Sequence, residues 1–155
     1  MLIHRLAGFT VAVVPAPPDD DEACQRIAAL LERAGARVAH PRARQVDAVV
    51  FAAPPASGTP RLRDVPVAFL DRTGPDGLVE ALARALAARA CTATVGSHRL
   101  EVRGHAAVLD GTLIPLSPVP LAVLRVLARR PGHVVPHATL RTLVEDGTGH
   151  AGTWR

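Results

Sequence analysis

An Asp-Gly pair set between two apolar segments is the feature that most constrains the fold of this chain. Asp110-Gly111 separates Leu100–Leu109 from Thr112–Ile114. Both central residues of a tight two-residue hairpin turn need a positive φ, so Asp-Gly between apolar runs is a strong hairpin signal. We therefore expect residues 100–114 to form a small antiparallel hairpin.

Two helices are expected directly after this hairpin. Ser117 suits a helix N-cap, and Pro118 suits the first helical position, where no backbone N–H donor is needed. The first helix is expected to end before Pro131-Gly132, and a second is expected over residues 136–144. The apolar positions expected to face inward are Leu121, Leu124, Leu127, Ala128, Leu140, Leu143 and Val144. Hairpin, helix, short link and helix is the order found in the first half of a winged helix.

The run that starts at Leu116 resembles the first-helix signature of the OmpR/PhoB-type winged-helix domain of bacterial response regulators. It reads Leu-Ser-Pro-Val-Pro-Leu-Ala-Val-Leu-Arg-Val-Leu-Ala-Arg-Arg-Pro-Gly-His-Val-Val, and the resemblance covers roughly residues 100–144. Pro120 and Pro136 stand where that family usually has an acidic residue and a capping serine. The resemblance implies a DNA-binding fold. We expect neither the family's recognition helix nor its β-hairpin wing after Val144, and hence at most weak, poorly specific DNA binding.

Positive charge is concentrated in the C-terminal part of the chain. Residues 92–155 hold 7 arginines and 4 acidic residues, a net charge of +3, whereas residues 1–91 hold 11 and 10, a net charge of +1. The candidate contacts to DNA phosphates are Arg125, Arg129, Arg130 and Arg141. The alternative is that these arginines only solvate the outer faces of short helices, because all 18 basic residues are arginine, a bias typical of high-GC genomes.

The first ninety residues follow an α/β pattern. Strands are expected at residues 9–14, 37–39, 48–52 and 65–70, and helices at residues 23–34 and 77–89. Asp19–Glu22 is expected to cap the first helix, and Gly35 is expected to end it. In the second helix we expect Leu78, Leu82 and Leu86 to face inward and Glu80 to pair with Arg84. The pattern predicts a small parallel sheet.

Two stretches of this part resemble uroporphyrinogen-III synthase. Leu6-Ala-Gly-Phe-Thr-Val-Ala-Val13 with Ala28-Ala-Leu-Leu-Glu-Arg-Ala-Gly-Ala-Arg-Val38 resembles its opening strand and helix, and Asp47-Ala-Val-Val-Phe51 resembles its Asp-hydrophobic-Phe strand. Some actinobacterial versions carry an OmpR-type winged helix at the C-terminus, a layout that accommodates both parts of this chain. Ala52-Ala53 replaces the usual Thr-Ser pair, and the chain is too short for the two lobes that enclose the linear tetrapyrrole substrate.

A receiver domain is the competing resemblance for the same residues. In that family the first strand ends in acidic residues and the third ends in a phospho-accepting aspartate. Val14-Pro15 and Ala52 occupy those positions here. We therefore expect no phosphorelay role and regard the N-terminal part as closer to the synthase.

The sequence predicts no catalytic residue, no cofactor and no metal site. His133 and His137 lie four residues apart, but Pro136 separates them and no third ligand is near. Ser97-His98 fits the start of a strand better than a nucleophile–base pair. Cys24 and Cys91 lack CxxC spacing and are expected to be free thiols of a reducing cytoplasm. No apolar stretch reaches the ~18 residues of a membrane span, so we expect a cytoplasmic protein without a membrane partner.

Together these patterns predict an α/β protein in two parts. A small parallel-sheet domain is expected over residues 1–90, an incomplete α+β winged-helix domain over residues 98–146 and a flexible tail over residues 147–155. The expected function is that of a transcription-regulator-like protein with DNA as partner. The alternatives are a degenerate uroporphyrinogen-III synthase-like lyase of tetrapyrrole biosynthesis and a non-catalytic protein-interaction module.

A missing recognition helix has a further consequence for partners. The face on which that helix would pack is expected to be apolar and to involve Leu124, Leu140 and Leu143. An exposed apolar face favours association, so self-association or a protein partner is also expected.

Overall fold

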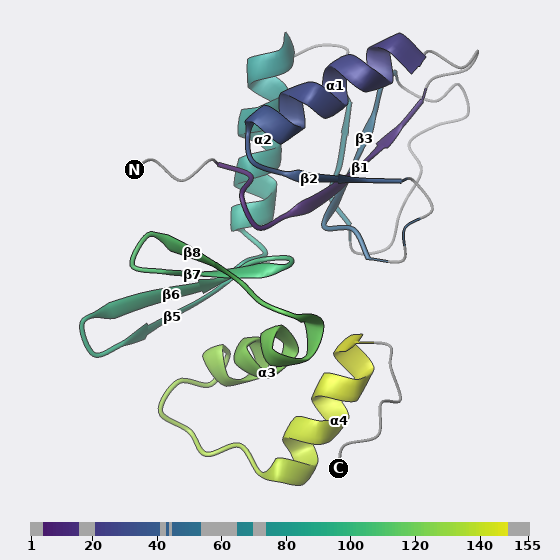
Figure 1. Cartoon of the computed structure of the whole chain (residues 1–155). Helices are drawn as coiled ribbons and strands as arrows, with labels where there is room; N and C mark the ends of the chain where they lie inside the picture. Colours follow the sequence, from purple (N-terminus) through teal and green to yellow (C-terminus); the bar gives the residue numbers. More distant parts are fainter. Residues whose placement is uncertain are drawn as a thin grey trace. The chain divides into compact units, whose positions relative to one another are not determined.

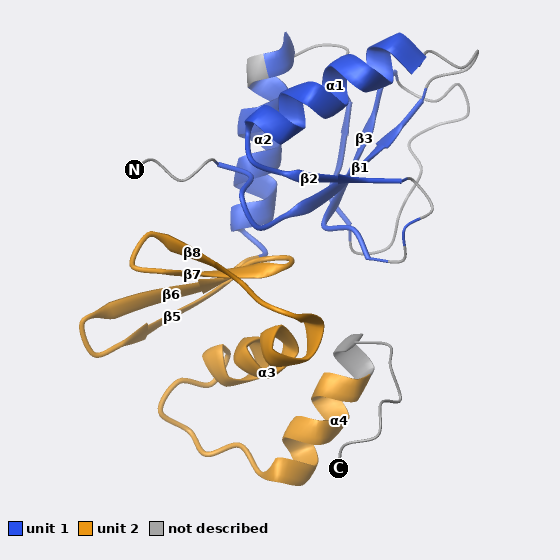
Figure 2. Cartoon of the chain, in the orientation of Figure 1, with its two compact units in different colours: residues 1–89 blue, residues 90–155 orange. Residues whose placement is uncertain are grey.

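The computed structural model describes residues 5–15, 21–40, 43, 45–53, 65–69 and 74–148. The chain divides into two compact units, Met1–Arg89 (unit 1) and Ala90–Arg155 (unit 2), each with its own sheet (Figures 1 and 2). A mixed α/β fold with a parallel sheet in the N-terminal part is therefore confirmed. No helix in the described part of the chain is long and apolar enough to cross a membrane.

Unit 1 is a parallel sheet with two helices. Its described strands are β1 (Thr10–Val14), β2 (Arg37–Ala39), β3 (Ala48–Phe51) and β4 (Val67–Phe69), and its helices are α1 (Asp21–Arg33) and α2 (Gly74–Ala87). The strand order is β2-β1-β3-β4, with every pair parallel. Helix α1 packs on β1 and β2, while α2 packs on β4 and contacts α1. The outer position of β4 agrees with the edge position that Pro66 favours.

The end of α1 follows the glycine signal in the sequence. Gly35 has a φ of 90°. Its N–H donates to the Glu32 carbonyl at 2.9 Å, and the Ala36 N–H donates to the Leu31 carbonyl at 3.0 Å, which together form a Schellman motif. The Arg37 N–H then donates to the Phe9 carbonyl at 2.9 Å, so β2 begins directly beside β1.

Asp47 fixes the start of β3 against β1. Its Oδ2 accepts a hydrogen bond from the Thr10 N–H at 2.7 Å, and its own N–H donates to the Thr10 carbonyl at 2.7 Å. A partly buried carboxylate that accepts a backbone N–H satisfies a donor that strand pairing leaves over. The aspartate before this hydrophobic strand thus has a structural role.

The core of unit 1 consists of aliphatic side chains from both helices and the central strands. Its largest fully buried side chains are Leu6, Val11, Ile27, Leu31, Val50, Leu78, Leu82 and Leu86. The inward positions predicted for α2 are confirmed. The helix begins at Gly74, however, and not at Gly77, because Pro75 suits its first turn. The predicted start of this helix at residue 77 is therefore wrong by three residues.

Unit 2 is an antiparallel sheet followed by two helices. The strands are β5 (Cys91–Val95), β6 (His98–Val102), β7 (Ala106–Leu109) and β8 (Thr112–Pro115), and the helices are α3 (Pro118–Ala128) and α4 (His137–Thr148). Neighbours in the chain are neighbours in the sheet, in the order β5-β6-β7-β8. The predicted hairpin turn is confirmed, since Asp110 and Gly111 have φ of 47° and 86° between paired Leu109 and Thr112.

The sheet of unit 2 is larger than the single hairpin that the sequence predicts. Residues 91–97, which lie between the two predicted domains, form β5 and the turn into β6, where Gly96 has a φ of 61°. The predicted segment Leu100–Leu109 contains the end of β6 and all of β7, because a tight turn closes at Arg103, whose N–H donates to the Ala106 carbonyl at 2.9 Å. The single hairpin is thus part of a four-stranded meander.

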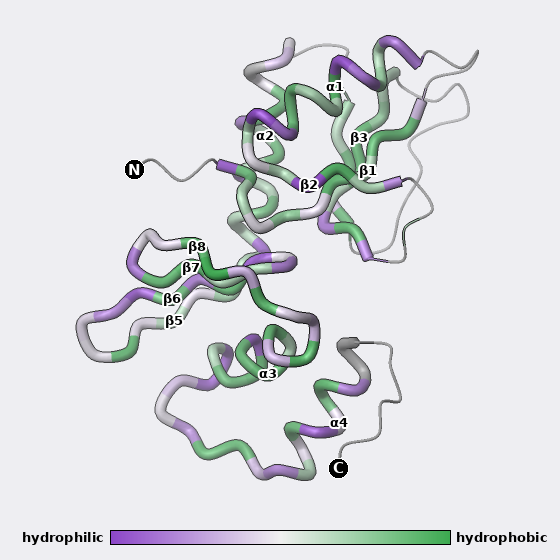
Figure 3. Tube along the Cα trace, viewed as in Figure 1, coloured by the Kyte–Doolittle hydropathy of each residue, from purple (hydrophilic) through white to green (hydrophobic). Residues whose placement is uncertain are grey.

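Helix α3 packs on β5 and β6, on one face of this sheet. Ala93, Val102, Leu121 and Ala128 form the buried cluster, and Cys91, Leu100, Leu116 and Leu124 pack against it. Hydrophobic residues dominate α3, whereas hydrophilic residues interrupt α4 (Figure 3).

Four details of the helices differ from the predictions. Ser117 occupies the N-cap position, but its side chain makes no capping hydrogen bond, and its carbonyl instead accepts the Leu121 N–H at 3.1 Å. Leu127 and Leu143, expected to face inward, are each 42% exposed. Helix α4 continues to Thr148, so residues 147 and 148 are helical and not part of a tail. The rest of the predicted tail lies outside the described residues.

Candidate nucleic-acid interface

A long segment of unit 2 carries positive charge and no negative charge. No acidic residue stands between Asp110 and Glu145, an interval that includes β8, α3, the link to α4 and the first two thirds of α4 itself. The ionisable side chains within it are Arg125, Arg129, Arg130, His133, His137 and Arg141. All four predicted phosphate contacts lie in this acid-free segment.

Arg129 and Arg130 are at the C-terminal end of α3, and both side chains are exposed. Their backbones complete the helix, because the Arg129 N–H donates to the Arg125 carbonyl at 3.3 Å and the Arg130 N–H donates to the Leu127 carbonyl at 3.0 Å. Among the residues that the structure describes, neither guanidinium group has an ion pair or hydrogen bond. These two cations are available to a partner in solution.

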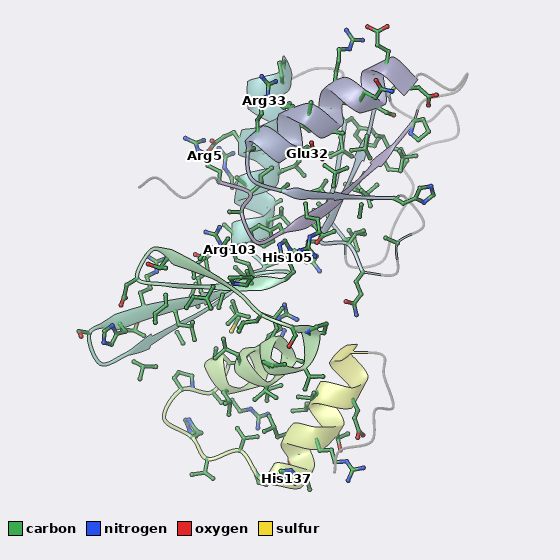
Figure 4. All side chains as sticks on the ribbon, in the orientation of Figure 1. Arg5, Glu32, Arg33, Arg103, His105 and His137 are labelled. Atoms are coloured by element: carbon green, nitrogen blue, oxygen red, sulfur yellow. The ribbon has the colours of Figure 1, made fainter. Side chains whose placement is uncertain are left out.

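Arg125 lies one turn earlier on α3 and has a different environment. Its partly buried guanidinium donates from Nη2 to the Arg103 carbonyl at 2.8 Å and to the Gly104 carbonyl at 3.4 Å. These carbonyls belong to the turn between β6 and β7, beside Arg103 and His105 in Figure 4. Arg125 therefore links α3 to the sheet, and its role differs from that of the exposed Arg129 and Arg130.

Arg141 is exposed on α4 and pairs within its own helix. Its Nε lies 3.0 Å from Glu145 Oε1, four residues further on. His137 is the first residue of α4 (Figure 4), and His133 Nδ1 lies 3.1 Å from the Pro131 carbonyl in the link. Within the described ranges no three His, Cys, Asp or Glu side chains are grouped to hold a metal ion.

The described acidic side chains of unit 2 are engaged by bases of the same unit. Glu101 pairs with Arg103 at 2.8 Å on β6 and the turn that follows, and the Asp110 carboxylate lies 2.5 Å from His98 Nδ1. Glu145 pairs with Arg141. Two of these pairs are local, whereas the His98–Asp110 pair forms only because β6 and the β7–β8 turn come together. They leave the positive charge of the acid-free segment uncompensated at the end of α3.

Asp110 is the best-anchored of these carboxylates. Its Oδ1 accepts the Arg99 N–H at 2.7 Å, and its own N–H donates to the Arg99 carbonyl at 2.9 Å. The hydrogen bond from the His98 side chain, followed by the Arg99 N–H, holds the pKa of the Asp110 carboxyl below its ordinary value of 3.8. The carboxylate thus remains ionised while it joins the β7–β8 turn to β6.

The three leucines expected to form an apolar face do not share one environment. Leu143 is exposed, whereas Leu124 packs against the buried cluster of unit 2 and Leu140 is partly buried. In unit 1, the carboxyl ends of β1 and β3 carry Val14-Pro15 and Ala52-Ala53. None of these side chains has a polar atom, so the described ends of both strands hold no group for acid–base or nucleophilic chemistry.

Comparison of the sequence with models of known protein families and with curated proteins finds no match to either. The fold itself places the chain in the broad class of mixed α/β proteins with a parallel-sheet unit and an antiparallel-sheet unit. Beyond this fold class, the most specific chemical feature of the chain is the acid-free segment of unit 2.

Proposed function

We propose that unit 2 binds the phosphate backbone of DNA, as the weak and poorly specific DNA-binding part of a transcription-regulator-like protein. The observation that carries the proposal is the exposed pair Arg129 and Arg130 within a segment that has no acidic residue. The resemblance of residues 116–135 to the first helix of OmpR/PhoB-type winged helices supports the same proposal.

The proposed interaction is electrostatic. Arginine side chains displace condensed counterions from phosphates, so the logarithm of the binding constant falls linearly with the logarithm of the salt concentration. Two arginines correspond to a slope of about −2, against about −10 for a strong repressor. Phosphate contacts position a protein on DNA without reading the bases. We therefore expect micromolar or weaker affinity with little preference among sequences.

The same arginines have a second physical role, which the test must separate from the first. Positive side chains in the last turn of a helix interact favourably with its dipole, typically by about 0.3–1 kcal/mol. If this were their whole contribution, removing them would lower helix stability and leave DNA affinity unchanged.

Fluorescence anisotropy with a labelled DNA duplex across a salt series tests the proposal. The protein is expected to bind at low salt, and Arg129→Ala with Arg130→Ala is expected to weaken binding and to reduce the salt slope by about one per arginine. Arg26→Ala with Arg33→Ala is a matched control, since it removes two exposed arginines of α1, one of them in its last turn. That control is expected to retain the slope of the unchanged protein.

Two results contradict the proposal. The first is an absence of binding even at low salt. The second is an equal loss of affinity in both double variants, which would assign the binding to the net charge of the whole chain and not to the end of α3.

A further inference from the structure

The outer strand β5 offers an unusual surface for pairing. It is the first strand of the sheet order β5-β6-β7-β8, so no described strand pairs with its outer edge. An outer strand presents backbone N–H and C=O groups that another strand can pair with. Proteins commonly protect such edges with charged residues, prolines, bulges or very short strands.

The other outer strands of the described sheets have such protection. Strands β2 and β4 are three residues long, β2 begins with an exposed arginine, and Pro66 precedes β4. Strand β8 ends in Pro115. Strand β5 has five residues without charge or proline, and its register to β6 is unbroken from Cys91↔Val102 to Val95↔His98, so it contains no bulge.

The side chains of β5 are suited to strand pairing. Thr92 and Thr94 are exposed on the face turned away from α3, since Ala93 between them is buried in the cluster that α3 covers. Val95 is 63% exposed. Threonine and valine are β-branched residues that favour sheets. The edge is therefore accessible, uncharged and composed of strand-forming residues.

The order of these residues makes the strand complementary to itself. Cys91-Thr-Ala-Thr-Val95 has the same character when read in either direction from Ala93: apolar, threonine, alanine, threonine, apolar. A two-fold axis through Ala93 would place Thr92 opposite Thr94 of a second copy, and Cys91 opposite Val95. Threonine pairs across antiparallel strands are favourable, and no charge would face a like charge. Interfaces of two-fold dimers need this kind of self-complementary patch.

We propose that β5 pairs antiparallel with β5 of a second copy of this chain, centred on Ala93, to form one continuous sheet of eight strands. The partner is a second copy and not an unrelated extended peptide. The symmetry of the strand about Ala93 makes its residues match when two copies pair about a two-fold axis, and it would not improve pairing with another sequence. The proposal does not depend on DNA binding. It brings two acid-free segments into one assembly.

Charge substitutions on the full chain, followed by sedimentation velocity over a range of concentrations, test the pairing and its register. The unchanged protein is expected to approach twice the mass of one chain as concentration rises. Thr92→Lys with Thr94→Lys sets lysine opposite lysine in the proposed register and is expected to abolish the dimer. Thr92→Lys with Thr94→Glu sets lysine opposite glutamate across the proposed interface, and also opposes the added lysine to Glu101 and the added glutamate to Arg99 on β6, so it is expected to retain the dimer. Thr112→Lys, at the exposed start of the other outer strand, is the control and is expected to retain the dimer.

A measurement on the unchanged protein makes the test independent of how the variants fold. Amide hydrogen exchange in β5 is expected to slow as protein concentration rises, while exchange in β8 is expected to stay constant. A monomer at every concentration overturns the proposal. So does a dimer that survives the double lysine change, which would place the contact on another surface such as the one around Leu143. Failure of the glutamate–lysine variant to dimerise overturns the proposed register.

Discussion

At the scale of single residues, Asp110 combines a backbone and an electrostatic role. Its positive φ forms the β7–β8 turn, and its carboxylate holds the His98 side chain and the Arg99 N–H. A lowered pKa means that the folded state favours the ionised carboxyl, so its contribution to stability is present above the unfolded pKa and is lost as pH falls through the folded pKa.

We predict that Asp110→Asn lowers the free energy of unfolding at neutral pH, and that the difference from the unchanged protein shrinks below about pH 4. Asparagine tolerates a positive φ, so the turn itself is retained and the effect reports the carboxylate. Urea unfolding at several pH values, with an NMR titration of the Asp110 carboxyl, checks this. A difference that does not change with pH would show that the charge has no role.

At the scale of elements, features that depend on one or two neighbouring residues could be predicted from the sequence. Features that depend on contacts between distant segments could not. The end of α1 at Gly35 and the turn at Asp110-Gly111 depend on positive φ at named residues, and both are found. Strand β5 depends on its pairing with β6, and the alternation of apolar residues with Thr92 and Thr94 was its only signal. Periodicity placed Leu127 and Leu143 on apolar stripes, but it does not determine which edge of a stripe becomes buried.

The sequence identified the arginines of the candidate site but not which of them are exposed. Arg125 and Arg129 lie four residues apart on α3 and are equivalent in the sequence pattern. They differ because the β6–β7 turn lies beside α3 in the folded chain. Its carbonyls accept hydrogen bonds from the Arg125 guanidinium, whereas the Arg129 guanidinium stays exposed. That turn lies about twenty residues earlier in the chain, and no local pattern indicates the contact.

The tether between α3 and this turn leads to a prediction about stability. Arg125→Ala removes the hydrogen bonds that its guanidinium donates to the Arg103 and Gly104 carbonyls, and we expect a loss of about 1–2 kcal/mol in the free energy of unfolding. Arg129→Ala, at an exposed position, is expected to cost less than about 1 kcal/mol. Urea unfolding followed by circular dichroism measures both. Equal effects of the two substitutions would mean that the tether contributes nothing to the stability of the fold.

At the scale of the whole molecule, each unit has its own sheet and its own core, and this determines how the chain should unfold. Leu82 is buried in unit 1, and Leu121 is buried in the cluster of unit 2. Truncation of a buried leucine to alanine typically costs about 2–5 kcal/mol. If the cores are energetically separate, each truncation acts on one cooperative transition only.

We therefore predict that Leu82→Ala and Leu121→Ala lower the midpoints of different thermal transitions, measured by differential scanning calorimetry. Hydrogen exchange at Val50 and Val102, buried in units 1 and 2 respectively, assigns each transition to its unit. A single transition that both substitutions lower equally would mean that the two cores unfold as one. In that case a change in DNA affinity caused by a substitution in unit 1 would follow from unfolding, and the Arg26 and Arg33 control would have to be compared at equal stability.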